Sequence, residues 1–292
     1  MMLSHQTAVI AICFVMYALH VTAAVKKGLR WHTGVMMSSA ALLLCMICAR
    51  LYYIAAWDLV GAGFFGPLFP QDPYSYAFGG GVLGYLLAVW LTSRFARQPL
   101  SAVGDAFAPA GLATIAALRL AEGLSDFGWG DMIETAWLQR YPFAIQNMFG
   151  EWCAAVFNLE ALCALVIAVV ILSPRFQGRR LTVGLLWWAV TQIFCESLRV
   201  ESIQWGFVRV QQLLSAIVLA VMLLMGTLRL PRGKRRPAAI SWLVFAACIG
   251  AVIFLEYALD KIPWPIWIDY AAMAAVLAVM GLTVQKTAVK KA

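Results

Sequence analysis

TGVMMSSAALLLCMICARLYYIAA, residues 33–56, contains one charged side chain, Arg50, in twenty-four residues. About 20 consecutive apolar residues are enough for a helix to cross the hydrocarbon core of a bilayer. The whole chain has this character: 63% of its 292 residues are hydrophobic, 12% are charged, and the mean hydropathy is +0.82. Soluble globular domains carry about twice that charged fraction. The sequence therefore predicts an all-α, polytopic transmembrane helical bundle.

About nine apolar runs are expected to span the membrane, and none shows the alternation of a β-barrel strand. They cover residues 6–24, 33–56, 77–93, 101–120, 152–172, 181–198, 208–228, 238–258 and 265–284. The fourth is the least regular, because it contains Pro109 among several Gly and Ala residues. We divide the chain into a seven-helix domain, 1–228, a basic cytoplasmic linker, 229–237, and a helical hairpin with a basic tail, 238–292.

The net charge of +8 indicates a membrane topology rather than a nucleic-acid site. Sixteen of the 22 basic residues follow the first, third, fifth, seventh and ninth runs. Lys and Arg concentrate on the cytoplasmic side of membrane proteins. We therefore expect the N-terminus outside and the C-terminus in the cytoplasm. Two long outer segments, 57–76 and 123–151, either lie on the outer leaflet or cover a lipid-facing site.

Charged side chains within or beside these runs are the candidate functional residues, because an unpaired ion at bilayer depth costs a few kcal/mol or more. Arg119 and Glu122 lie three residues apart at the end of the fourth run. Glu196 and Arg199 have the same spacing at the end of the sixth run. Residues three apart share a helix face, so each pair could be a local ion pair. The alternative is that several helices bring arginines to one outer cavity.

This alternative predicts a site for an anionic lipid head group. The arginines at that depth are Arg50, Arg119, Arg199 and Arg209, and Glu160 lies inside the fifth run. The planar guanidinium group of arginine binds two phosphate oxygens at once and stays charged. No metal site is expected, because Cys45 and Cys48 form the only CxxC-like pair and no histidine cluster supports it.

Several segments, in order, resemble the bacterial prolipoprotein diacylglyceryl transferase family over roughly residues 10 to 228. They are CARLYY (48–53), AFGGGVLG (77–84), DAFAP (105–109) followed by Arg119 and Trp129-Gly130, YPFA (141–144), FNLEAL (157–162), and ESLRVESIQWGF (196–207) followed by QQLLS (211–215). The order and spacing of the segments carry the resemblance more than any one of them. Two predicted C-terminal helices extend beyond it.

The resemblance implies transfer of a diacylglyceryl group from phosphatidylglycerol to a lipobox cysteine thiol of a secreted precursor. It also implies a multi-pass location in the bacterial cytoplasmic (inner) membrane and a reaction that needs no metal or bound organic cofactor. Arg119, Arg199 and Glu122 are the implied catalytic residues. The implied substrate-binding residues are Arg50, Trp129, Gly130, Glu160, Glu196 and Arg209, and the motif regions contain Gly79, Gly80, Gly81 and Asp105.

The chain departs from the family pattern at positions that bear on the chemistry. The motif histidine falls at Gly79, a signature asparagine at Glu122, a tyrosine of the first helix near Cys13, and an arginine at Gln192. Glu122 either competes with phosphate for Arg119 or replaces the missing base. Three functions therefore stay open: a divergent diacylglyceryl transferase, a non-catalytic lipid-binding relative, and a transporter or flippase for an anionic solute or lipid.

Overall fold

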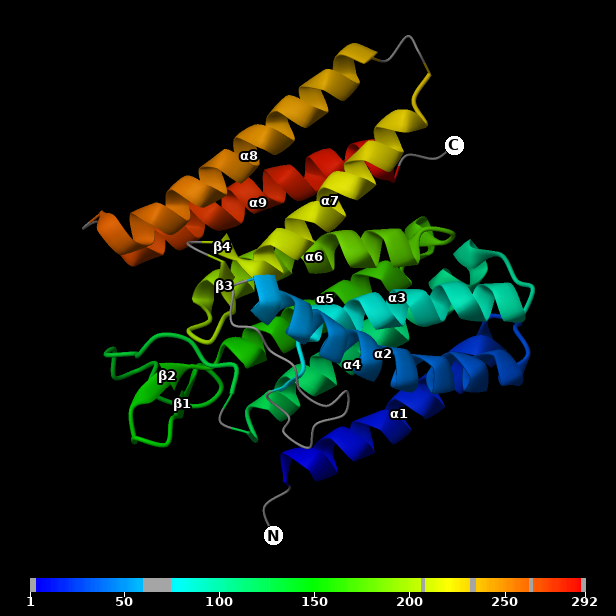
Figure 1. Cartoon of the computed structure of the whole chain (residues 1–292), viewed down its shortest axis with the longest axis horizontal. Helices are drawn as coiled ribbons and strands as arrows, with labels where there is room; N and C mark the ends of the chain where they lie inside the picture. The colour runs from blue at the N-terminus through cyan, green and yellow to red at the C-terminus, as the bar shows by residue number, and fades with distance from the viewer. Residues whose placement is uncertain are drawn as a thin grey trace. The chain divides into compact units, whose positions relative to one another are not determined.

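The computed structural model describes residues 4–59, 75–125, 127–205, 208–231, 235–262 and 265–289. Nine α-helices contain most of these described residues (Figure 1). They are α1 (His5–Lys26), α2 (Trp31–Leu59), α3 (Phe78–Phe95), α4 (Leu100–Glu122), α5 (Val156–Leu172), α6 (Arg180–Leu198), α7 (Val210–Leu228), α8 (Arg235–Lys261) and α9 (Ile266–Ala288). Each apolar run forms a helix as predicted. Most of the outer segment 57–76 lies outside the described residues.

Seven of the described helices, all except α3 and α5, are long and apolar enough to cross a membrane. The chain is thus a multi-pass membrane protein. α4 continues through Pro109 as a single helix. α5 begins at Val156 rather than at the expected residue 152, because residues 152–154 form a β-strand.

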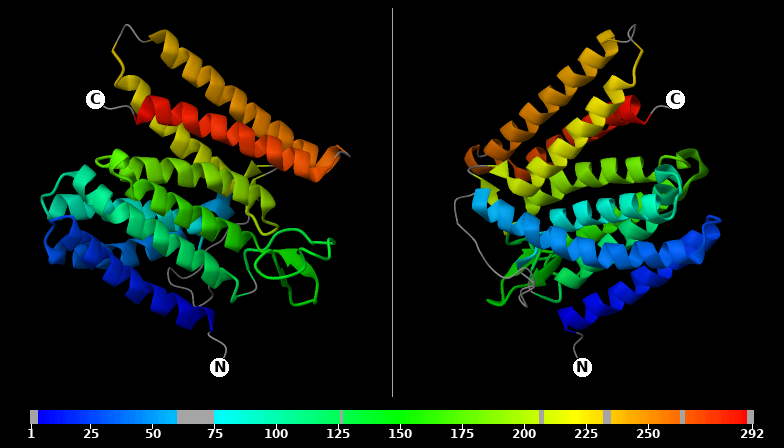
Figure 2. Two further views of the ribbon diagram at one scale, coloured as in Figure 1. Left: turned by 180° about the vertical axis from the view of Figure 1, so that it is seen from behind. Right: turned by 45° about the vertical axis from the view of Figure 1, so that its right-hand side comes forward.

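The chain forms two compact units. The first consists of residues 1–184 and 199–210, and the second of residues 185–198 and 211–292. The first unit thus contains α1 to α5, and the second contains most of α6 together with α7, α8 and α9. In this division, α7 groups with the C-terminal helices α8 and α9. The predicted domain boundary at residue 228 stays a prediction. Within the second unit, α8 and α9 lie side by side as a hairpin (Figure 2).

Hydrogen bonds between helices hold the second unit together. The carboxylate of Glu256 in α8 accepts a hydrogen bond from the Ser197 hydroxyl of α6. The same carboxylate accepts one from the Gln212 side chain of α7, at 2.7 Å. Trp187 of α6 donates from its indole nitrogen to the side-chain oxygen of Gln285 in α9, at 2.8 Å. The hairpin is therefore joined to α6 and α7 by polar contacts.

Glycines bring α2 and α3 of the first unit into close contact. A Cβ atom on Gly80 would overlap the backbone oxygen of Cys48, and one on Gly84 would overlap that of Leu44. Small residues allow membrane helices to approach in this way. A Cβ atom on Gly81 would instead meet nothing within 4 Å. The AFGGGVLG segment therefore packs on one face and leaves open space on another.

Two short antiparallel ribbons complete the first unit. One pairs β1 (Ala144–Gln146) with β2 (Trp152–Ala154), and the other pairs β3 (Gln204–Trp205) with β4 (Val208–Arg209). The first ribbon lies in the long segment between α4 and α5 (Figure 1). The second follows α6 and leads directly into α7.

Asp105 contributes to the fold near the start of α4. Its carboxylate accepts hydrogen bonds from the backbone nitrogens of Gly178 and Arg180, the second at 2.8 Å. These bonds fix the turn that begins α6. Asp105 lies fourteen residues before Arg119 on the same helix, or about 21 Å along its axis.

Candidate functional site

Four charged side chains of the first unit form one buried cluster, named here the ion cluster. Glu160 of α5 lies 2.8 Å from Nε of Arg119 and 2.7 Å from Nη2 of Arg199. Glu122 pairs with the same two guanidinium groups, through Oε1 to Arg119 and through Oε2 to Arg199. Two cations therefore share two anions, and the formal charges cancel.

Burial makes these pairings energetically important. The side chains of Arg119 and Glu160 are 1% exposed, and that of Arg199 is 6% exposed. Glu122 is the most open member, at 16%. Buried ions lose several kcal/mol of hydration each, so the cluster is stable only while its charges are paired. Glu160 contacts both arginines, which explains how an apolar helix tolerates a buried glutamate.

Backbone pairing positions Arg199, which directly follows the last residue of α6. Arg199 forms an antiparallel bridge with Gly130, and the Val200 nitrogen donates to the Trp129 oxygen at 3.3 Å. Arg209 donates through Nη1 to the backbone oxygen of Arg199. Three predicted substrate-binding residues therefore contact the backbone of the segment that carries Arg199.

Gly128 is a site residue that the sequence analysis does not identify. Its φ angle is +79°, a conformation that glycine adopts without steric cost. A Cβ atom there would lie 2.6 Å from Oε2 of Glu122 and 3.1 Å from Nη2 of Arg199. Its carbonyl oxygen accepts from the Phe157 nitrogen at 3.1 Å. The conformation and the lack of space both require glycine, and its place in FGWG before the signature Gly130 is the available sequence signal.

The structure brings together two of the predicted arginines, Arg119 and Arg199, and gives Arg50 contacts of its own. The guanidinium carbon of Arg119 also lies 3.7 Å from the centre of the Phe78 ring, a cation–π contact. Arg50 is fully buried, donates to the backbone oxygen of Ser75 at 2.9 Å, and lies 5.5 Å from the centre of the Tyr53 ring. The ion cluster does not include Arg50.

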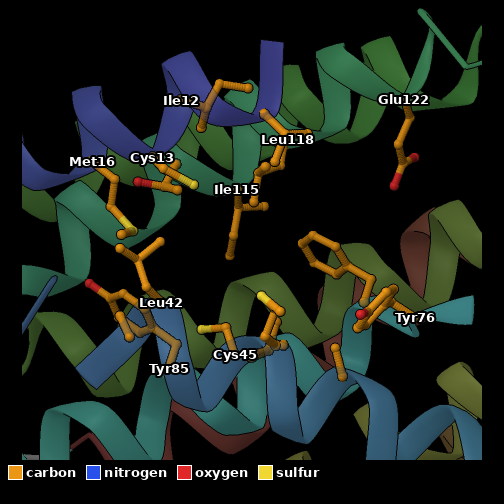
Figure 3. Close-up of a pocket in the computed structure, with 18 of the residues that line it drawn as sticks. Ile12, Cys13, Met16, Leu42, Cys45, Tyr76, Tyr85, Ile115, Leu118 and Glu122 are labelled. Atoms are coloured by element: carbon orange, nitrogen blue, oxygen red, sulfur yellow. The ribbon is translucent and has the colours of Figure 1, made fainter. Parts of the chain in front are cut away.

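An apolar cavity of about 390 Å³ lies between α1, α2, α3 and α4 (Figure 3). This volume is within the range of small-molecule sites. Side chains from all four helices form its walls, including Ile12, Cys13, Met16, Leu42, Cys45, Tyr85, Ile115 and Leu118. Glu122 is the one member of the ion cluster that lines the cavity, and Figure 3 shows its carboxylate directed into that space.

The motif glycines occupy two kinds of position in α3. Gly79 and Gly80 are buried in α3, while Gly81 lines the cavity. Glu196 is buried near the end of α6 in the second unit, and its predicted role in orienting Arg199 stays a prediction. Among the described residues, no group of three His, Cys, Asp or Glu side chains is placed to hold a metal ion.

Comparison of the sequence with known proteins identifies one family. The family model described as prolipoprotein diacylglyceryl transferase matches residues 5–228. The chain belongs to this family. The transferase match ends at the last residue of α7 and leaves α8 and α9 outside it. The resemblance found in the sequence is thus confirmed, as is the extension beyond it.

Relatives named phosphatidylglycerol–prolipoprotein diacylglyceryl transferase are similar to this chain at modest identity. The protein from Legionella pneumophila strain Paris is 32% identical over 152 residues, which cover 51% of this chain and 59% of the relative. That from Clostridium novyi strain NT is 25% identical over 194 residues, 63% of this chain and 75% of the relative. That from Listeria monocytogenes serotype 4a is 25% identical over 207 residues, 68% and 74%.

Replacing Glu160 by glutamine tests whether this carboxylate holds the transferase-family fold together. We expect Glu160→Gln to lower the free energy of unfolding by about 3–5 kcal/mol, because two buried guanidinium groups lose a shared anion. The measurement is denaturant unfolding of the protein in detergent, followed by tryptophan fluorescence. Glu134→Gln, at an exposed position between α4 and α5, is the control and should change stability by about 0.5 kcal/mol or less. Equal stability of the two variants would contradict this role.

Proposed function

We propose that this family member transfers the diacylglyceryl group of phosphatidylglycerol to the cysteine thiol of a lipobox in a secreted precursor. One observation carries the proposal. The carboxylate of Glu122 lines an apolar cavity and also forms ion pairs with Arg119 and Arg199. A phospholipid has the matching parts, an apolar chain and a phosphate. The names of the relatives supply the donor and the class of acceptor.

Phosphate binding would proceed by exchange of one anion for another. Glu122 bridges the two guanidinium groups with its two carboxylate oxygens, as two oxygens of a phosphate could. An acyl chain in the cavity would bring the phosphate to Glu122, which would turn away and release Arg119 and Arg199. Glu160 would remain in place as their permanent counter-ion. The cations would thus stay paired before and after the exchange.

The transfer would form one carbon–sulfur bond and break one carbon–oxygen bond. The acceptor thiol loses its proton, since the thiolate is the nucleophile. The thiolate attacks the diacylglyceryl carbon that carries the phosphate, and the carbon–oxygen electron pair departs with glycerol phosphate. Negative charge then accumulates on the leaving phosphate. Fixed guanidinium groups in a site that excludes water would stabilise that charge strongly.

All nine helices would cross a bacterial inner membrane, with the N-terminus outside and the C-terminus in the cytoplasm. The distribution of basic residues supports this topology. α3 and α5 have 18 and 17 residues, about 27 and 26 Å of helix, against a hydrocarbon core of about 30 Å. The end of α4 and the start of α5 would then lie on the outer side, where a secreted precursor arrives.

A lipid-binding relative without transferase activity is the second candidate. One observation favours it: carboxylates already pair with Arg119 and Arg199. The sequence resemblance also implies that Gly79 takes the place of the motif histidine. Both candidates require phospholipid binding, and only the first requires formation of a thioether.

Lipid transfer by the purified full chain tests the proposed activity. Vesicles of phosphatidylglycerol and a synthetic lipobox peptide should yield a peptide heavier by one diacylglyceryl group, together with free glycerol phosphate. Arg119→Lys should lower the rate about 10²- to 10³-fold, because lysine cannot reproduce the planar contact with the phosphate. Arg140→Lys, at an exposed position, is the matched control and should keep the wild-type rate. A folded wild-type protein that forms no thioether would refute the proposed transfer.

Glu122→Gln tests the exchange of anions. Without the carboxylate, the two guanidinium groups retain only Glu160 as an anionic partner in the ion cluster. We therefore expect the Kd for phosphatidylglycerol to fall about tenfold, which corresponds to about 1.4 kcal/mol. Displacement of a fluorescent phosphatidylglycerol from the detergent-solubilised protein measures this Kd. Unchanged or weaker binding would show that phosphate does not replace Glu122.

Filling the cavity tests the place of the acyl chain. Gly81→Leu adds a side chain where a Cβ atom meets nothing within 4 Å, at a position that lines the cavity. We expect phosphatidylglycerol binding to weaken at least tenfold with little loss of stability, because the leucine takes the volume of the lipid. Gly250→Leu in α8 has equally open space and should bind lipid as the wild type does. Wild-type binding by Gly81→Leu would place the acyl chain elsewhere.

A further inference from the structure

The imidazole group of His5 lies at the cavity beside the ion cluster. His5 is the first residue of α1, and its side chain lines the cavity together with Glu122 and Ser125. Its Nδ1 atom lies 2.9 Å from the backbone oxygen of Ala121, the residue that precedes Glu122 on α4. A hydrogen bond between α1 and α4 therefore fixes this imidazole next to the carboxylate that faces the cavity.

The partner of Nδ1 determines which nitrogen can take up a proton. A carbonyl oxygen only accepts hydrogen bonds, so Nδ1 of His5 carries the hydrogen atom of this bond. In the neutral ring, Nε2 then carries the lone pair. Within the described part of the chain, the bond to Ala121 is the one hydrogen bond of this side chain. Nε2 is thus available to a molecule in the cavity.

The other two histidines are placed differently. His20 is fully buried, and both of its ring nitrogens are engaged, Nδ1 with the Ser38 hydroxyl at 3.1 Å and Nε2 with the Tyr85 hydroxyl at 2.9 Å. His32 is exposed at the start of α2 and stacks on Trp31. His5 therefore combines a position on the cavity with an available basic nitrogen, and the other two do not.

We propose that His5 accepts the proton of the acceptor thiol and so replaces the imidazole that is missing at Gly79. This inference rests on the proposed transferase function. The S–H proton moves to Nε2, the thiolate forms the carbon–sulfur bond, and the electron pair of the broken carbon–oxygen bond leaves with glycerol phosphate. The imidazolium then gives the proton to the departing phosphate. Glu122 lines the same cavity as His5 and, once released from the arginines, would be an anion available to stabilise the imidazolium.

His5→Asn removes the proposed base and keeps the hydrogen bond to Ala121. The asparagine amide can still donate to the Ala121 oxygen but has no nitrogen that accepts a proton. We expect the transfer rate to fall about 10²- to 10⁴-fold, the usual contribution of a general base, while the Kd for phosphatidylglycerol changes less than twofold. His32→Asn is the matched control and should keep the wild-type rate and affinity.

A selenocysteine peptide gives a readout that a structural role would not change. A selenol is already ionised at neutral pH and needs no base to become a nucleophile. The difference in rate between His5→Asn and the wild type should therefore shrink to less than tenfold with this acceptor. Free imidazole added to His5→Gly should likewise restore part of the transfer to the cysteine peptide.

The outcomes distinguish this inference from the proposed function. A wild-type rate in His5→Asn would overturn the role of His5 and leave the transferase proposal intact. Loss of phosphatidylglycerol binding in His5→Asn, or an equal deficit with both peptides, would give His5 a structural role and also overturn the inference. Absence of transfer by the folded wild-type protein would refute the transferase function itself.

Discussion

The carboxylate of Glu160 allows two guanidinium groups to lie together inside an apolar bundle, and the rest of the site depends on it. Like charges repel strongly where water is excluded, so Arg119 and Arg199 need an anion between them. Glu160 provides it from α5, at 2.8 Å from one and 2.7 Å from the other. This contact joins α4, α5 and the segment after α6 at one point. The ion cluster is therefore part of the structure of the first unit.

Charge neutrality also determines what such a site can select. A cluster with an excess of positive charge would attract any anion, whereas this one already holds Glu122 across both arginines. A competing ligand has to supply the same two oxygen contacts and gain additional free energy elsewhere. An acyl chain entering the cavity could supply that gain through burial of apolar surface. On the proposed function, this combination would favour a molecule with a phosphate and a long apolar chain over a small free anion.

Hydropathy and short-range spacing predicted the helices and one of the ion pairs, and they failed where distant segments meet. Arg119 and Glu122 pair as their spacing on α4 indicates. Glu196 and Arg199 have the same spacing, but α6 ends at Leu198, and Arg199 pairs with carboxylates 77 and 39 positions away in the chain. The positive φ angle of Gly128 and the position of His5 likewise depend on tertiary contacts. No periodicity within one helix could have revealed them.

The hydrogen bonds of Glu256 connect the C-terminal hairpin to helices of the matched region. The transferase family match ends at residue 228, yet this carboxylate from α8 accepts from Ser197 and Gln212 inside the matched region. Removal of α8 would take this acceptor away from both donors. The hairpin therefore supplies a polar contact to two helices of the matched region, and its deletion would be felt inside that region.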